Sequence, residues 1–115
     1  MALIKEINVG IDFYHRLTNR DYNQGDGKHT AAVDFRNKFL KELDSEDAWK
    51  NPEKKIILDF KEVKKIGPSF ANEAFGYFTK YAEPGTIFKV IEIKNASNVQ
   101  LEIIKIELDS ARSGK

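Results

Sequence analysis

Cysteine is absent from this chain of 115 residues, and histidine occurs only twice. The first absence excludes disulfides, thiolate chemistry and cysteine-ligated metals. An excess of either charge is also missing, because 19 basic and 18 acidic residues leave a net charge of +1. This balance provides no field that would steer the protein onto nucleic acid or an anionic membrane.

Long apolar runs are missing as well. No stretch approaches the roughly 18 apolar residues that span a bilayer, and the first ten residues lack the layout of a signal peptide. We therefore expect a cytoplasmic protein with neither a membrane nor a nucleic-acid partner.

The amino-acid composition is that of an ordinary folded domain. Hydrophobic residues make up 41% of the chain and charged residues 32%. This composition supports one continuous core but not two. We predict a single domain over 1–115, with a long polar loop at 15–29 and a frayed tail at 109–115.

Three segments carry the patterns of β-strands. Every second residue over 7–13 is apolar, which is typical of a strand with one wet face. Residues 55–60 form a short apolar run, which indicates a buried strand. Residues 86–93, with the sequence TIFKVIEI, alternate and predict a third strand.

Three further segments carry helical patterns. Residues 31–43 repeat apolar side chains every three or four positions after Thr30, a fair N-cap. A second helix begins near Pro68 and is stopped by Glu-Pro-Gly at 83–85. Residues 97–108 also alternate like a strand, but the need to cover a sheet favours a helix. The inner stripe of the second helix is Ala71, Ala74, Phe75, Phe78 and Ala82.

Strands and helices thus alternate along the chain. The connections are long enough for parallel crossovers. The sequence predicts an α/β fold of order βαβαβα, with helices packed on a small, mostly parallel sheet.

The polar loop contains two motifs that suggest ligands. GDGKHT at 25–30 resembles a phosphate-binding loop, but Tyr22 replaces the first glycine and His29 the final Ser or Thr. We interpret it as a flexible turn. His15 and His29 are two solvated histidines rather than the three or four converging ligands that a metal needs. No metal or cofactor is therefore expected.

Trp49 lies in an acidic segment, DSEDAWKNPEKK at 44–55. An exposed tryptophan would indicate a contact surface. We favour the alternative, in which the ring packs over the end of the helix at 31–43 and closes the core.

Ser69 follows Gly67 and Pro68 at the mouth of the second helix, in IILDFKEVKKIGPSFANEAFGYF at 56–78. A serine there can cap backbone N–H groups, or it can turn its hydroxyl outward where the helix dipole favours a phosphate. The flanking residues are not the G-x-S-x-G elbow, and neither histidine is near in sequence. The chain is therefore not expected to be an enzyme.

The same stretch resembles the STAS domain of anti-sigma-factor antagonists. Asp59 of the LDF run precedes Ser69 by ten residues, the spacing of the phosphorylatable serine in those proteins. IGPSFANEAFGYF, with Phe35 and Arg36 as an FR pair, is more similar to the STAS-like domain family of unknown function. The resemblance spans roughly residues 5–108 and implies a STAS-like α/β fold.

This resemblance implies a regulatory, non-catalytic module that binds a protein. The partner would be a histidine-kinase-like ATPase of the anti-sigma type, and Ser69 would be the candidate phosphoacceptor. The docking surface would comprise Gly67, Pro68, Ser69, Phe70, Asn72, Glu73 and Tyr77.

The chain departs from the antagonists beside the serine. Gly67 stands where they carry an acid, Phe70 where they carry glycine, and Asn72 where many STAS-like members carry Asp. Phe70 falls off the predicted inner stripe, so we expect an exposed hydrophobic anchor. For Glu73 we expect a hydrogen bond to Arg36 or to the neighbouring loop. For Gly76 we expect the close approach of another backbone.

An alternative interpretation is a sensor of a small ligand, anion or nucleotide. The 15–29 loop would fold over the N-terminus of the second helix, with Arg16, Arg20 and Lys28 contacting the anion. A mixed, solvated loop is the competing interpretation of those three cations.

Overall fold

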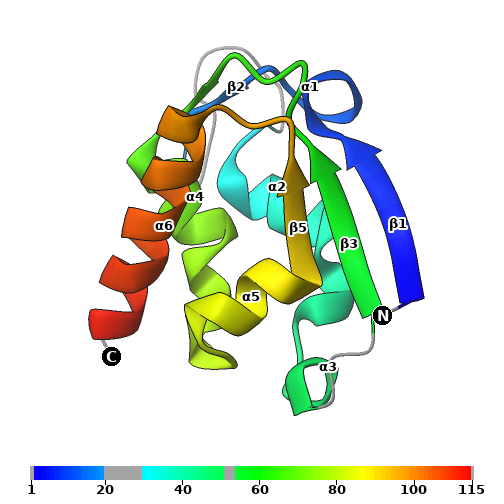
Figure 1. The fold of residues 1–115 in the computed structure, drawn as a ribbon, viewed down its shortest axis with the longest axis vertical. Coiled ribbons are helices and arrows are strands. Elements are labelled where there is room, and N and C mark those ends of the chain that lie inside the picture. Colours follow the sequence, from blue (N-terminus) through cyan, green and yellow to red (C-terminus); the bar gives the residue numbers. More distant parts are fainter. Residues whose placement is uncertain (1, 20–29, 51–53, 115) are drawn as a thin grey trace.

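The chain folds into a mixed α/β domain, shown in Figure 1. The computed structural model describes residues 2–19, 30–50 and 54–114. None of the helices in those three ranges is both long enough and apolar enough to cross a membrane.

Two parallel sheets form the β-structure. The larger one has three strands, in the order β1 (Ala2–Asn8), β3 (Lys54–Asp59) and β5 (Ile91–Lys94). The smaller one is a two-stranded parallel ribbon made of β2 (Arg16–Leu17) and β4 (Lys65–Ile66). The predicted α/β class and parallel strand arrangement are confirmed.

Helical segments connect and cover these strands. They are α1 (Val9–Asp12), α2 (Ala32–Phe39), the 3-10 helix η1 (Lys41–Leu43), α3 (Asp47–Lys50), α4 (Pro68–Ala74), the 3-10 helix η2 (Gly76–Lys80), α5 (Pro84–Val90) and α6 (Asn98–Ser113).

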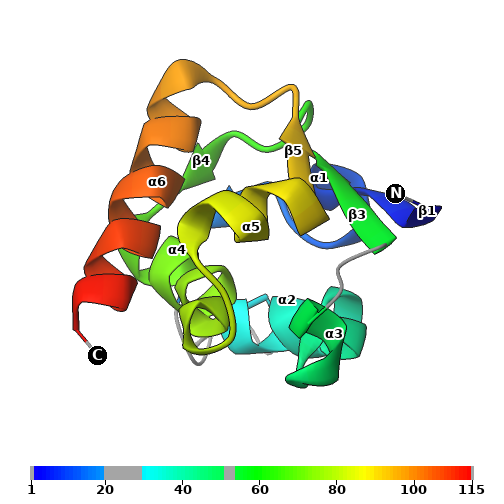
Figure 2. The same cartoon turned by 60° about the horizontal axis from the view of Figure 1, so that its bottom comes forward.

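The larger sheet is buried on one face only. In β3, Ile56 and Leu58 are fully buried, whereas Ile57 between them is half-buried. Figure 2 shows α2 and α3 together on one side of the strands. On the other face, the ion pair Lys55–Glu92 (2.9 Å) joins the neighbouring strands β3 and β5, and the pair Glu6–Lys94 (2.6 Å) reaches across β3 from β1 to β5. Parallel sheets usually have both faces covered. The prediction of a buried strand is therefore correct for alternate residues of β3 only.

The first strand ends earlier than its alternation predicts. The Asn8 side chain accepts a hydrogen bond from the Ile11 N–H (3.3 Å), and the Asp12 carboxylate accepts one from the Asn8 N–H (3.1 Å). These local bonds favour a helical turn over further strand. Residues 9–12 consequently form α1, and Ile11 is 70% exposed. The predicted strand over 7–13 is wrong beyond Asn8.

The predicted third strand is also wrong in its first half. Pro84 occupies the first turn of a new helix, α5, rather than simply ending the previous one. Ile87 and Val90 are buried at helical spacing, and the strand β5 begins only at Ile91. Alternate apolar residues over 87–93 fit both patterns, so the sequence alone does not separate them.

The C-terminal segment is a helix, as predicted, and it continues beyond residue 108. The Ser97 side chain accepts from the Gln100 N–H (3.1 Å), while the Gln100 side chain accepts from the Ser97 N–H (2.9 Å). This reciprocal pair is a capping box. The helix α6 then extends to Ser113, whereas the helix predicted from the sequence ended at residue 108.

The other two predicted helices form with small changes. The predicted helix over 31–43 is realised as α2 followed by η1, and its N-cap is Ala31 rather than Thr30. The second helix starts at Pro68 as predicted and tightens into η2 at Gly76. Trp49 is 6% exposed and its indole N–H donates to the Leu43 carbonyl (2.7 Å), which confirms its predicted role in the core.

Candidate functional site

Gly67 lies where the ribbon strand β4 passes into α4. Its N–H donates to the Leu17 carbonyl of β2 (2.8 Å), and its carbonyl accepts from the Ala71 N–H (3.1 Å). Pro68 then occupies the first helical position, where the missing N–H costs nothing. The ribbon and the helix therefore fix the start of α4 from both sides.

Ser69 is exposed in this first turn. The N-cap is Gly67, which offers no side-chain bond, so Ser69 does not cap the helix. Among the described residues, its hydroxyl has no hydrogen-bond partner. The outward-facing interpretation of this serine is correct, and the capping interpretation is not.

Phe70 is fully buried, contrary to the expectation of an exposed anchor. Its ring lies 5.6 Å from that of Phe35 in α2 and 6.4 Å from that of Phe13, measured between centroids. It shares a helical stripe with Ala74, four residues later, because α2 packs against that side of α4. A ring in this position fills the core and is not available to a partner.

Glu73 and Tyr77 are held inside the fold by Arg36 of α2. The Arg36 guanidinium donates to the Glu73 carboxylate (2.7 Å) and lies 3.7 Å from the centre of the Tyr77 ring. The expected bond between Glu73 and Arg36 is confirmed. The pair is mostly shielded, since the Arg36 side chain is 10% exposed and that of Glu73 20%.

Asp44, which is exposed, contacts the cluster formed by Arg36, Glu73 and Tyr77 through Tyr77. One of its carboxylate oxygens accepts from both the Tyr81 hydroxyl (2.8 Å) and the Tyr77 hydroxyl (2.9 Å). The hydrogen bond from Tyr81 contributes most to lowering the pKa of Asp44, and the same bond raises the pKa of Tyr81. This acid follows η1 directly and was not singled out by the sequence patterns, because no motif marks it.

The C-terminal part of the motif contacts α6. The Asn72 amide donates to the Glu107 carboxylate (3.3 Å). A Cβ on Gly76 would lie 2.9 Å from the Ala111 Cβ and 3.5 Å from the Glu107 carbonyl oxygen. Another element does approach Gly76 closely, as expected, and that element is α6, but its nearest atom belongs to the Ala111 side chain rather than to the backbone.

Of the three predicted anion contacts, the structure describes only Arg16, which is exposed on β2. Arg20 and Lys28 lie outside the described residues, so the sensor interpretation stays a prediction. Directly across the ribbon from Arg16 lies Lys65 of β4, also exposed. Sequence reasoning missed this pairing, although the Lys-Lys run at 64–65 was a visible signal.

The remaining ligand motifs fall mostly outside the described part of the chain. The GDGKHT run up to His29 lies there, whereas His15, the other histidine of the loop, is described. Within the ranges that the structure describes, no group of three histidines or acids is arranged to hold a metal.

A cavity of about 590 Å³ lies at the start of β1 and β3. It is lined by Ile4, Glu42, Leu43, Ser45, Asp47, Ala48 and Lys54. None of these residues belongs to the mouth of α4. The candidate site at Ser69 is therefore an open surface and not the lining of this cavity.

Comparisons with known proteins identify one family. Residues 31–101 match the family described as STAS-like domain of unknown function (DUF4325). No curated protein and no solved structure matches the chain. The matched region contains α2, β3, β4, α4, α5 and β5, which together carry the Arg36–Glu73 pair and the mouth of α4. The chain thus belongs to the STAS-like domain family of unknown function.

Proposed function

We propose that this chain is a regulatory, non-catalytic interaction module whose partner docks at the mouth of α4. The family match and the resemblance of the LDF-to-serine spacing to anti-sigma-factor antagonists support a regulatory role. By that resemblance, the partner would be a histidine-kinase-like ATPase, and Ser69 would accept its phosphate.

One observation carries this proposal. Ser69 is exposed, and its hydroxyl makes no hydrogen bond to any described residue. Asn72, Glu73 and Tyr77 instead bond to α6, to α2 and to Asp44. Modification of Ser69 would therefore alter the surface without breaking a contact of the fold.

A phosphate on Ser69 would change the local charge strongly. It would add about two negative charges and three acceptor oxygens in the first turn of a helix, where negative charge is favourable. The added charge would therefore change the affinity of a partner that contacts Pro68 and Ser69.

Incubation of the protein with a histidine-kinase-like ATPase and ATP, followed by mass mapping of the phosphate, tests this proposal. We expect one phosphate on Ser69 and none on the Ser69→Ala variant. Ser97 is the internal control, because its hydroxyl oxygen is engaged in the capping box of α6. Phosphate on Ser97, or no phosphate at any residue, would contradict the phosphoacceptor role.

A further inference from the structure

The β2–β4 ribbon places two cations directly opposite each other. Arg16 and Lys65 are register partners, and both are exposed. Their neighbours Leu17 and Ile66 point inward and are buried, so the two charged side chains share the outer face. Neighbouring strands lie about 5 Å apart, which brings the bases of the two side chains close together. We call this pair the cationic ribbon.

Neither cation has a carboxylate partner among the described residues. Some cations elsewhere in the fold are paired across elements, as in Lys5–Glu42, Lys55–Glu92 and Arg112–Glu83, but no other two exposed cations without an ion pair to a described residue are register partners in the described strands. Like charges directly opposite in a sheet are destabilising. A local arrangement that opposes stability is more often found where a surface has a function.

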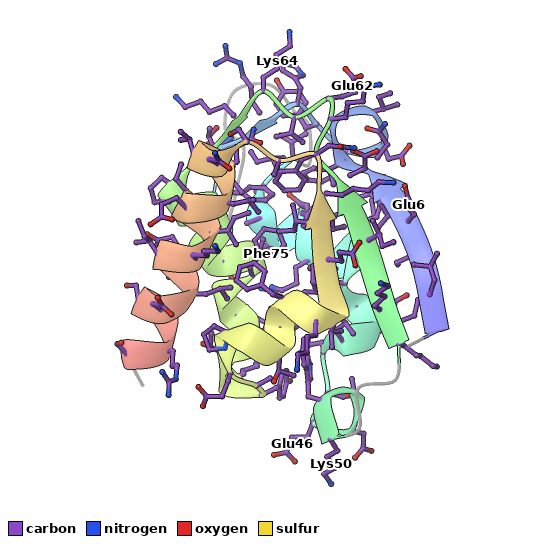
Figure 3. All side chains as sticks on the ribbon, in the orientation of Figure 1. Glu6, Glu46, Lys50, Glu62, Lys64 and Phe75 are labelled. Atoms are coloured by element: carbon purple, nitrogen blue, oxygen red, sulfur yellow. The ribbon has the colours of Figure 1, made fainter. Side chains whose placement is uncertain are left out.

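The turn before β4 adds to the positive charge. Lys61 and Lys64 are exposed, and Glu62 is the one acid within 61–65. The Lys64 N–H donates to the His15 carbonyl (2.8 Å), so this turn is held beside the start of β2. Figure 3 shows Lys64 and Glu62 at the same end of the molecule, opposite to the end that carries Glu46 and Lys50.

The cationic ribbon borders the mouth of α4. Gly67 bonds to Leu17, and Thr18 lies 3.8 Å from the position that a Cβ on Gly67 would take. Ser69 follows Lys65 by four residues, at most about 14 Å of extended chain. The Cα atoms of Lys65 and Ser69 are therefore separated by less than about two Debye lengths at physiological salt, where one Debye length is about 8 Å.

We infer that the cationic ribbon docks an acidic segment of a protein partner, with carboxylates against Arg16 and Lys65. This inference rests on the proposed function, for which it supplies the chemistry of the partner. A short acidic segment fits better than nucleic acid, because the chain has a net charge of only +1 and Glu62 would repel a long polyanion. Phosphate on Ser69 would compete with the partner's carboxylates and weaken docking.

A hexaglutamate peptide with a fluorescent label is a suitable probe, with binding followed by anisotropy at 20 mM and 150 mM salt. The test variant is Arg16→Glu with Lys65→Glu. The matched control is Lys41→Glu with Lys89→Glu, two exposed lysines of η1 and α5 that have no ion pair to a described residue and whose reversal changes the net charge equally. We expect at least a tenfold loss of affinity in the test variant and less than twofold in the control.

Three results would overturn the inference. They are equal losses in both double variants, no peptide binding at 20 mM salt, or tighter binding of a six-phosphate oligodeoxythymidylate, which would indicate a nucleic-acid surface. If the charge-reversed variant does not fold by circular dichroism, the Arg16→Gln, Lys65→Gln variant takes its place, with glutamines in the control as well.

The same probe separates this inference from the proposed function. Ser69→Glu should weaken peptide binding severalfold, whereas Ser110→Glu on the exposed face of α6 should not. Phosphate mapped to Ser69 without peptide binding would leave the proposed function standing and refute the inference. Ribbon-dependent peptide binding without phosphorylation would support the acidic partner and refute the phosphate switch.

Discussion

At the scale of single residues, Gly76 shows how closely α6 approaches the end of the α4 segment. A Cβ there would meet the Cβ of Ala111 at 2.9 Å, closer than van der Waals contact. Protein interiors are packed densely enough that such an overlap forces neighbouring atoms to move. Glycine in a helical position costs about 1 kcal/mol relative to alanine, and here the close packing of α6 offsets that cost.

We predict that Gly76→Ala destabilises the protein by about 1–3 kcal/mol, the usual cost of overpacking. Urea unfolding measures the effect. Gly85→Ala is the control, because a Cβ at that helical position has no atom within 4 Å. The control should be neutral or slightly stabilising. A stabilised Gly76→Ala variant would show that α6 adjusts freely.

At the scale of elements, α2 and α4 are joined by contacts of two kinds. Phe35 and Phe70 bring their rings together in the core, while the Arg36–Glu73 pair closes over them. Backbone and side chain together, Arg36 is 8% exposed. Its Nε also donates a long hydrogen bond to the Glu73 carbonyl oxygen (3.4 Å). Removing one partner of such a shielded pair leaves a buried charge without compensation.

We predict that Glu73→Gln lowers the free energy of unfolding by about 2–4 kcal/mol, near the range for breaking a buried pair. The exposed pair Asp47–Lys50 provides the control, since its side chains are 91% and 68% exposed. Asp47→Asn should change stability by less than about 0.5 kcal/mol. Equal effects of the two substitutions, measured by chemical denaturation, would rule out a special role for the Arg36–Glu73 pair.

At the scale of the whole molecule, surface carboxylates link stability to pH. The pKa of Asp44 is lowered chiefly by the Tyr81 hydroxyl, and that of Asp59 chiefly by the Asn95 amide. A pKa that is lower in the folded than in the unfolded state contributes stability above the unfolded value, near 4 for Asp. That contribution disappears as the pH falls through the folded value.

We therefore predict that the urea midpoint falls between pH 6 and pH 3. The urea midpoint of the Asp44→Asn, Asp59→Asn variant should fall less steeply over the same pH range, because the two amides do not titrate. Asp109→Asn, at an exposed position on α6 with no hydrogen bond or ion pair to another described residue, should keep the wild-type pH dependence. Identical slopes for the double variant and the wild type would refute the contribution of these two acids.

Local signals were sufficient for several features. Pro68 marked the start of α4, and Gly76 indicated a close approach. The exposure of Ser69 was also predictable. So was the hydrogen bond that the Glu73 carboxylate accepts from Arg36. The start of α4 depends on residues a few positions apart, where helix geometry dominates. For Gly76 and Glu73 the residue type indicated a contact, although the partners, Ala111 and Arg36, are distant in the sequence.

Other features depended on contacts between distant segments. The burial of Phe70 depends on α2, which supplies Phe35, whereas the inner stripe predicted from the sequence did not include Phe70. Residues 87–93 likewise fit helix and strand, and the core selected a helix that ends at Val90. The side-by-side arrangement of Arg16 and Lys65 arises only when β2 and β4 pair.

By itself, the sequence determined the α/β class, the parallel connections and the start of α4, because these follow from periodicity and local geometry. Only the tertiary structure decided that Phe70 is buried and that two cations share one face of the ribbon. The physical reason is that burial and charge proximity are properties of packed elements, and no single segment contains the surfaces against which it packs.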